Sequence, residues 1–107
     1  MTAKRIAELN DQFRKTFLSG SVLATNGIAG LPEQDRREIF TKVRAFDTFS
    51  EDNDPYGEHD FGAIDHKGDK IFWKIDYYDP TMTYGSEDPA DPQKTRRVLT
   101  IMFANEY

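Results

Sequence analysis

Cysteine is absent from this chain of 107 residues, which excludes a disulfide framework, a thiolate zinc site and a cysteine nucleophile. Long apolar runs are absent as well: no stretch approaches the roughly 20 residues of a membrane span. The start of the sequence also lacks the apolar segment of a signal peptide. We therefore expect a cytoplasmic protein whose core is stable without covalent cross-links.

A basic stripe of the kind that binds nucleic acid is also missing. The formal net charge is −5, and it is unevenly spread: residues 1–46 carry +3, residues 47–91 carry −10 and residues 92–107 carry +2. Affinity for a phosphate backbone comes mainly from basic side chains that release counterions, so direct nucleic-acid binding is disfavoured. The acidic middle is interpreted as a solvated surface, a cation site or a surface complementary to a basic partner.

Aromatic residues, in contrast, are plentiful. They make up 13% of the chain, and hydrophobic residues make up 37%. Large aromatic side chains supply much of the energy of burial, and this content is enough for one modest core. We predict a single ordered domain spanning residues 1–107.

Apolar residues at helical spacing predict two amphipathic helices. The first spans residues 3–18, and the second opens at Pro32, which is tolerated in the first turn of a helix. Between them, residues 21–25 predict an edge strand that is closed by a turn at Asn26-Gly27.

The second half of the chain predicts strands. Residues 61–65 and 70–78 predict two strands on either side of a turn containing Gly68, and the alternation of side chains in the second strand places Trp73 on the buried face of this hairpin. Residues 96–104 predict a further strand, although Asp91-Pro92 is equally suited to cap a helix running to the terminus.

Two segments predict no regular structure: residues 47–57 and the proline-rich residues 79–92. Together these elements predict an α+β fold with two layers. An antiparallel sheet of three or four strands would have both helices on one face.

Four sequence blocks resemble those of a family of short bacterial proteins of unknown function, whose members are often encoded on plasmids or other mobile elements. The blocks are Asp52–Gly62, Trp73–Asp79, Gly85–Pro92 and Arg97–Met102. The resemblance implies no activity, cofactor or catalytic residue. It does favour a role in anti-defence or in maintenance of the mobile element.

Tyrosines interleaved with carboxylates suit the binding of a basic protein groove, because tyrosine gives a large contact area and carboxylates pair with Arg or Lys. The leading interpretation is a non-enzymatic protein that occupies a basic, nucleic-acid-binding surface of a partner. The predicted contact residues are Asp52, Asp54, Tyr56, Glu58, Asp76, Tyr78, Asp79, Glu87, Asp88 and Asp91.

The alternative is a small metal-dependent hydrolase centred on Glu58, His59 and Asp60, with Asp54 as a fourth ligand. An EF-hand does not fit these residues, and the chain lacks a nucleophile elbow and a phosphate-binding glycine loop. The one set worth testing for catalysis is His59 with Asp60, Asp76 and Tyr78. We therefore favour a protein without catalytic residues or cofactor, and a homodimer formed through the exposed sheet face is a third possibility.

Overall fold

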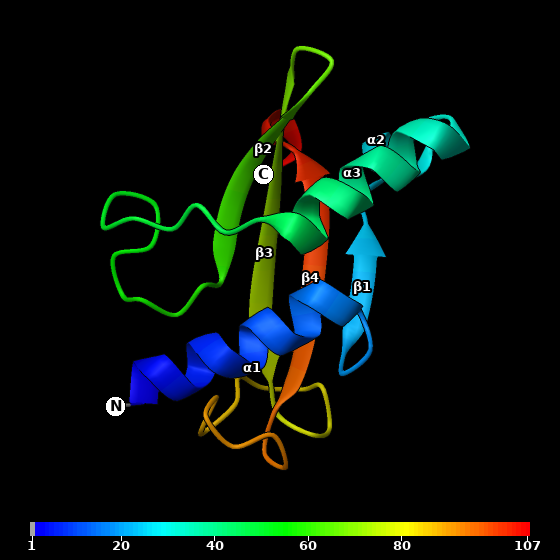
Figure 1. The fold of residues 1–107 in the computed structure, drawn as a ribbon. Coiled ribbons are helices and arrows are strands. Elements are labelled where there is room, and N and C mark those ends of the chain that lie inside the picture. Colours follow the sequence, from blue (N-terminus) through cyan, green and yellow to red (C-terminus); the bar gives the residue numbers. More distant parts are fainter. Residues whose placement is uncertain (1) are drawn as a thin grey trace.

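The structure is a computed structural model and describes residues 2–107. Two long helices and four strands form the fold, together with two short helical turns (Figure 1). The elements are α1 Thr2–Thr16, β1 Ser21–Ala24, α2 Asn26–Ala29, α3 Glu33–Ala45, β2 Phe61–His66, β3 Asp69–Tyr78, β4 Arg96–Phe103 and the 3-10 helix η1 Ala104–Glu106. The α+β class predicted from the sequence is confirmed.

The four strands form one sheet in the order β1-β4-β3-β2. As predicted, β2 pairs antiparallel with β3, and β3 pairs antiparallel with β4. However, β1 pairs parallel with β4, so the sheet is mixed: the predicted antiparallel arrangement holds for β2, β3 and β4 and not for this edge. A parallel pair needs a long connection between its strands, and α3 with the β2–β3 hairpin supplies it.

The last strand occupies a central position. The residues from Arg96 form β4 and not a helix, and β4 lies between β1 and β3. Leu99 and Ile101 are completely buried. Apolar and β-branched residues suit a strand that is paired on both sides, which explains why this run adopts β structure.

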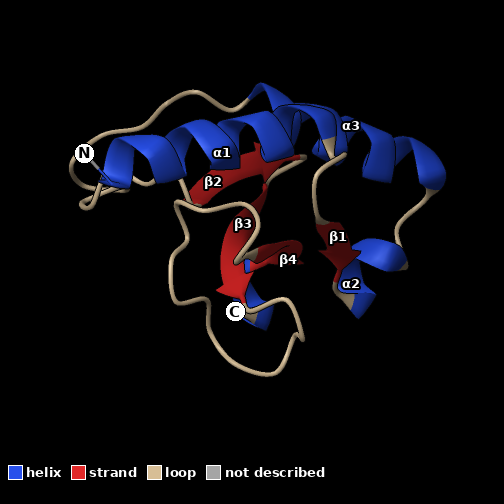
Figure 2. Cartoon of the chain, turned by 90° about the horizontal axis from the view of Figure 1, so that it is seen from below, coloured by secondary structure: helices blue, strands red, loops and turns tan. Residues whose placement is uncertain are grey.

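Both α1 and α3 cover the same face of the sheet (Figures 1 and 2). The core lies between these two layers, where Phe13 of α1, Ile39 and Val43 of α3, and Trp73 of β3 are completely buried. Burial of a large apolar side chain contributes roughly 1.5–3 kcal/mol. The expected contact between the two helices and the tryptophan face is thus the main source of stability.

The β2–β3 hairpin turns at Lys67 and Gly68, which both have positive φ, 51° and 88°. Two positive φ values give a turn whose twist matches that of the flanking strands. Within the hairpin, Gly62 lies against the indole of Trp73: a Cβ atom added to Gly62 would lie 2.4 Å from Nε1. Glycine at this position therefore allows the large ring to pack against β2.

Two boundaries differ from the sequence predictions. Helix α1 ends at Thr16 because Phe17 adopts a left-handed conformation with φ 60°, which the helix pattern does not reveal. Asn26 and Gly27 begin the short helix α2 instead of forming a simple turn. This helix places Ile28 in the core, completely buried, so tertiary packing decides its conformation.

Residues 46–60 lead into β2, and residues 79–95 connect β3 to β4. We call these segments loop 46–60 and loop 79–95. Because Phe61 pairs with Lys74, the start of β2 and the end of β3 lie at the same end of the sheet, opposite the hairpin turn. Loop 79–95 lies beyond this end of β3 and β4, and loop 46–60 lies beside the start of β2 at the edge of the sheet (Figure 1); we call the region of these two loops the acidic end.

Candidate functional site

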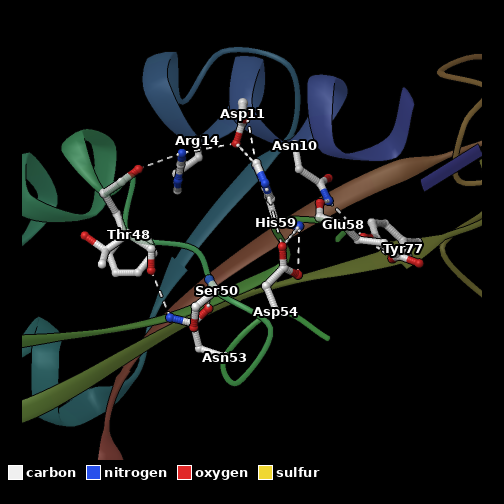
Figure 3. A network of polar contacts seen from close by, with 11 residues as sticks. Asn10, Asp11, Arg14, Thr48, Ser50, Asn53, Asp54, Glu58, His59 and Tyr77 are labelled. Carbon is white, nitrogen blue, oxygen red and sulfur yellow. Dashed lines mark hydrogen bonds and ion pairs between the residues drawn. The ribbon is translucent and has the colours of Figure 1, made fainter. Parts of the chain in front are cut away.

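Loop 46–60 is fastened to helix α1 through His59 (Figure 3). The Nδ1 atom of His59 lies 3.0 Å from both carboxylate oxygens of Asp11. The backbone N–H of His59 donates to Asp54, and its ring stacks on Phe49 with 3.8 Å between centroids. Since His59 has a φ of 57°, unusual for a residue other than glycine, these contacts hold a strained backbone in place.

Arg14 is a second attachment between α1 and this loop. Its side chain is only 1% exposed, and Nη2 donates to the carbonyl oxygen of Phe46 at 2.9 Å. The guanidinium lies over the rings of Phe49 and Trp73, 5.5 and 5.1 Å from their centroids. Its Nε and Nη1 atoms have no hydrogen-bond partner among residues 2–107, so attraction to the two ring faces is the main compensation for burying these two atoms.

Asn10 joins the same loop to the sheet. Its amide donates to the carbonyl oxygen of Glu58 at 2.9 Å and to the Tyr77 hydroxyl at 2.8 Å. The Tyr77 hydroxyl in turn donates to the Glu58 carboxylate, and Arg97 donates to the amide oxygen of Asn10. Burial raises the pKa of Tyr77, which keeps the phenol protonated as a donor.

Carboxylates accumulate where loop 46–60 meets the sheet. Burial raises the pKa of Asp60 above its usual value, and the negative charges of Glu58, Asp54 and Asp76 raise it further. These four acids come from both the loop and β3, so the fold concentrates negative charge here. Lys74, which lies 2.9 Å from Asp76, provides one positive charge nearby.

Loop 79–95 has a different construction, because short-range hydrogen bonds within the loop hold it. The Asp79 carboxylate accepts from the backbone N–H of Thr83 and from the hydroxyl of Thr81, and these bonds lower its pKa. Asp88 accepts from the N–H of Ala90, and Asp91 accepts from the N–H of Gln93. A hollow of about 410 Å³ opens beside this loop, lined by Asp79, Pro80, Tyr84, Gly85, Glu87 and Lys94.

The predicted contact residues lie in three places. Asp52, Asp54, Tyr56 and Glu58 belong to loop 46–60; Asp79, Glu87, Asp88 and Asp91 belong to loop 79–95; and Asp76 and Tyr78 lie on the sheet face that lacks helices. Asp54 and Glu58 turn inward to His59 and Tyr77, whereas Asp52, Tyr56 and Glu87 are exposed. Among the ion pairs of residues 2–107, only Asp76 of these acids pairs with a lysine or arginine.

Among residues 2–107, the alternative metal ligands Asp54, Glu58, His59 and Asp60 form no group of three, although His59 Nε2 lies 3.7 Å from Asp54. Within residues 2–107, three potential ligand atoms lie within 4.8 Å of one another only at Asp35, Glu38 and His66. That cluster was not predicted, although two carboxylates three residues apart on a helix are a recognisable signal. Its charge is already balanced, since Lys67 lies 2.8 Å from Asp35 and Lys42 lies 3.4 Å from His66.

The set of His59, Asp60, Asp76 and Tyr78 is divided as well. His59 faces α1, where it contacts Asp11, whereas the β3 register places Asp76 and Tyr78 on the face that lacks helices. The two histidines, His59 and His66, belong to separate clusters at opposite ends of β2.

Sequence reasoning missed the residues of α1 and β4 that organise the site: Asn10, Asp11, Arg14 and Arg97. A signal was present in α1, because Asn10 and Arg14 are four residues apart beside the apolar stripe that contains Phe13. Polar residues on a buried helix face must find partners, and here those partners lie in loop 46–60.

Fold and site together define a two-layer α+β protein with two acidic loops, of which loop 46–60 is attached to the first helix, α1. The chain belongs to a family of proteins of unknown function (DUF3768), whose model matches residues 24–106. This match covers both acidic loops, and it confirms the resemblance to a family of unknown function. No curated protein and no solved structure matches the chain. Among residues 2–107, no helix has both the length and the apolar character that crossing a membrane requires.

Proposed function

We propose that this protein is a non-enzymatic binding protein whose acidic end occupies a basic, nucleic-acid-binding surface of a partner protein. The observation that carries the proposal is that two acidic segments join the same end of the β2–β3 hairpin, one beside β2 and the other beyond β3. Residues 46–60 contain six acidic residues, residues 75–93 contain five, and neither segment contains a lysine or arginine. Such a surface repels nucleic acid and attracts the groove that binds it.

The exposed tyrosines strengthen this interpretation. Tyr56 in loop 46–60 is 81% exposed and Tyr84 in loop 79–95 is 74% exposed. Tyrosine is enriched in protein interfaces, because its ring gives contact area while its hydroxyl remains hydrogen-bonded. The hollow beside Tyr84, with Asp79 and Glu87 in its lining, suits the insertion of an arginine side chain.

The interface in this proposal consists of the exposed residues of the two loops. Asp54 and Glu58 contribute charge while they also hold loop 46–60 in place. Asp76 and Tyr78 lie beyond the loops, on the sheet face, and we place them at the margin of the surface. An inhibitor encoded by a mobile element and directed against a nucleic-acid-handling defence enzyme is the form of this function that the sequence resemblance favours.

The test begins with two reversed charges, Asp52→Lys and Glu87→Lys, one in each loop. Both residues are exposed, and neither side chain takes part in the hydrogen bonds that fasten the loops. The matched control is Asp65→Lys with Asp69→Lys, which makes the same charge change near the hairpin turn. Each protein is used to capture partners from nuclease-treated host lysate, and the captured proteins are identified by mass spectrometry.

A captured partner is then purified, loaded with a fluorescent oligonucleotide and titrated with each protein. We expect the wild-type protein and the hairpin control to displace the oligonucleotide, and the loop variant to lose at least about tenfold in affinity, since close charge pairs at interfaces couple strongly. Displacement should also weaken with added salt. Equal displacement by the loop variant, or capture without displacement, would contradict the proposal.

A further inference from the structure

The sheet carries its two long helices on one face, and neither of them covers the opposite face (Figure 2). We call this opposite side the helix-free face. The strand register places Phe61 beside Lys74 and Ala63 beside Phe72 on it. Tyr107 packs there too, with its ring centroid 6.0 Å from that of Phe61 and 5.7 Å from that of Phe72.

Strand β3 supplies the centre of this face with four alternating side chains: Phe72, Lys74, Asp76 and Tyr78. In order, they are aromatic, cationic, anionic and aromatic. Residues two positions apart in a strand are about 7 Å apart, so the row extends for roughly 20 Å. In the opposite direction, the row is again aromatic, charged, charged and aromatic, but the anion now precedes the cation. Two such rows that face each other in antiparallel orientation therefore place each cation opposite an anion and each aromatic ring opposite an aromatic ring.

The central charges are accessible. The side chains of Lys74 and Asp76 are 35% and 38% exposed while they pair with each other at 2.9 Å. At the edges of the face, Leu23 is 54% exposed and Tyr107 is 75% exposed. A water-exposed sheet face normally carries polar side chains, whereas this one combines one ion pair with aromatic and aliphatic groups.

We propose that the helix-free face is the interface of a homodimer, in which β3 of one copy lies antiparallel over β3 of the other. A two-fold axis through the middle of the row places Lys74 over the partner's Asp76 and Phe72 over the partner's Tyr78. Each contact then occurs twice, as an isologous interface requires. This inference does not depend on the proposed function.

The size of the face is consistent with this arrangement. Four strands spaced about 4.8 Å apart, with a mean length of about seven residues, present roughly 450–500 Å² per copy. On this face, Val98 and Met102 are already buried within one copy, at 6% and 2% exposed, so two copies bury at most about 1,000 Å², which is near the lower limit for a specific interface. We accordingly expect an association that depends on protein concentration.

The antiparallel arrangement also limits repulsion between two chains of net charge −5. The acidic end and the hairpin turn lie at opposite ends of β3. A two-fold axis that lies between the two sheets, parallel to them and at right angles to β3, places the acidic end of one copy over the hairpin turn of the other, so the two acidic ends are kept apart. A parallel arrangement would bring them together, at a cost that increases at low ionic strength.

The test uses the purified full-length chain and two complementary variants, Lys74→Asp and Asp76→Lys. Across the interface, the first variant brings carboxylates against carboxylates and the second brings ammonium groups against ammonium groups. We expect sedimentation analysis to show a dimer for the wild-type protein at high concentration. Each variant alone should show at least about a tenfold weaker association, and an equimolar mixture should recover the dimer through opposite charges.

Circular dichroism melts of each variant establish that its monomer is folded, and recovery in the mixture cannot result from misfolding. The control is Lys15→Asp on the exposed side of α1, which should leave dimerisation unchanged. The proposal is overturned if the wild-type protein stays monomeric up to about 1 mM, the weak end of measurable affinity. A mixture that fails to associate more strongly than either variant overturns it equally.

Discussion

The two acidic loops illustrate two ways of ordering a segment that lacks a core of its own. Loop 46–60 is held from outside: residues of α1 contact His59 and the backbone at Phe46 and Glu58, and Phe49 stacks on His59. Loop 79–95 is held mainly from within, by aspartate and serine side chains that bond to groups at most nine residues away. The first loop therefore depends on the whole fold, and the second depends largely on its own sequence.

Among the substitutions that separate the two loops, Arg14→Ala should have the largest effect on stability. The substitution removes a buried side chain that bonds to the backbone of loop 46–60 and packs on Phe49 and Trp73, so we expect a loss of about 3 kcal/mol in the free energy of unfolding. Urea denaturation measures this loss, and hydrogen exchange should rise in loop 46–60 well before it rises in loop 79–95.

The matched control is Arg37→Ala. The Arg37 side chain is 73% exposed in a surface ion pair, so we expect a change within about 0.5 kcal/mol. Equal increases in exchange in both loops after Arg14→Ala would show that the two are not independently anchored.

A smaller effect is expected at His59. His59→Ala removes the stack on Phe49 and the contact with Asp11, which should cost about 1–2 kcal/mol. His59→Gly removes the same contacts but relieves the positive φ of 57°, so it should be less destabilising than alanine by about 1 kcal/mol. Thermal unfolding of both variants tests this order, and a glycine variant less stable than the alanine variant would rule out backbone strain at this position.

The smallest effects concern pH, and they should have opposite signs in the two loops. The pKa of Asp79 is lowered by hydrogen bonds in the folded state, so its contribution to stability is present above the usual aspartate pKa and is lost as pH falls through the folded value. The pKa of Asp60 is raised by burial and neighbouring carboxylates. Asp60 therefore destabilises the folded state progressively as pH rises from the usual aspartate pKa through the folded value.

Thermal unfolding of Asp79→Asn and Asp60→Asn between acid and neutral pH measures this contrast. At neutral pH, we expect Asp79→Asn to be less stable than the wild-type protein and Asp60→Asn to be more stable. Both differences should shrink toward the acid end, where the wild-type carboxyl groups are protonated. Differences of the same sign at neutral pH would contradict the opposite electrostatic environments of the two loops.

The sequence predicts the parts of the site that depend on local contacts, as in loop 79–95, better than the parts that depend on distant contacts, as in loop 46–60. Aspartate, proline and glycine in residues 79–92 indicated an irregular segment because these residues bond to, or restrict, the backbone close by. Nothing local could join Asp11 to His59, which are 48 residues apart, or Arg97 to Asn10, which are 87 apart. The sequence therefore located the acidic segments but missed the side chains that position one of them.

For the fold, the sequence by itself determined the strands, the burial of Trp73 and the α+β class, because alternation and helical spacing are properties of neighbouring residues. The tertiary structure alone decided that β1 runs parallel to β4, that Asn26 and Gly27 enter a helix, and that α1 fastens loop 46–60. These outcomes depend on which surfaces meet when distant segments pack, and no short window of sequence contains that information.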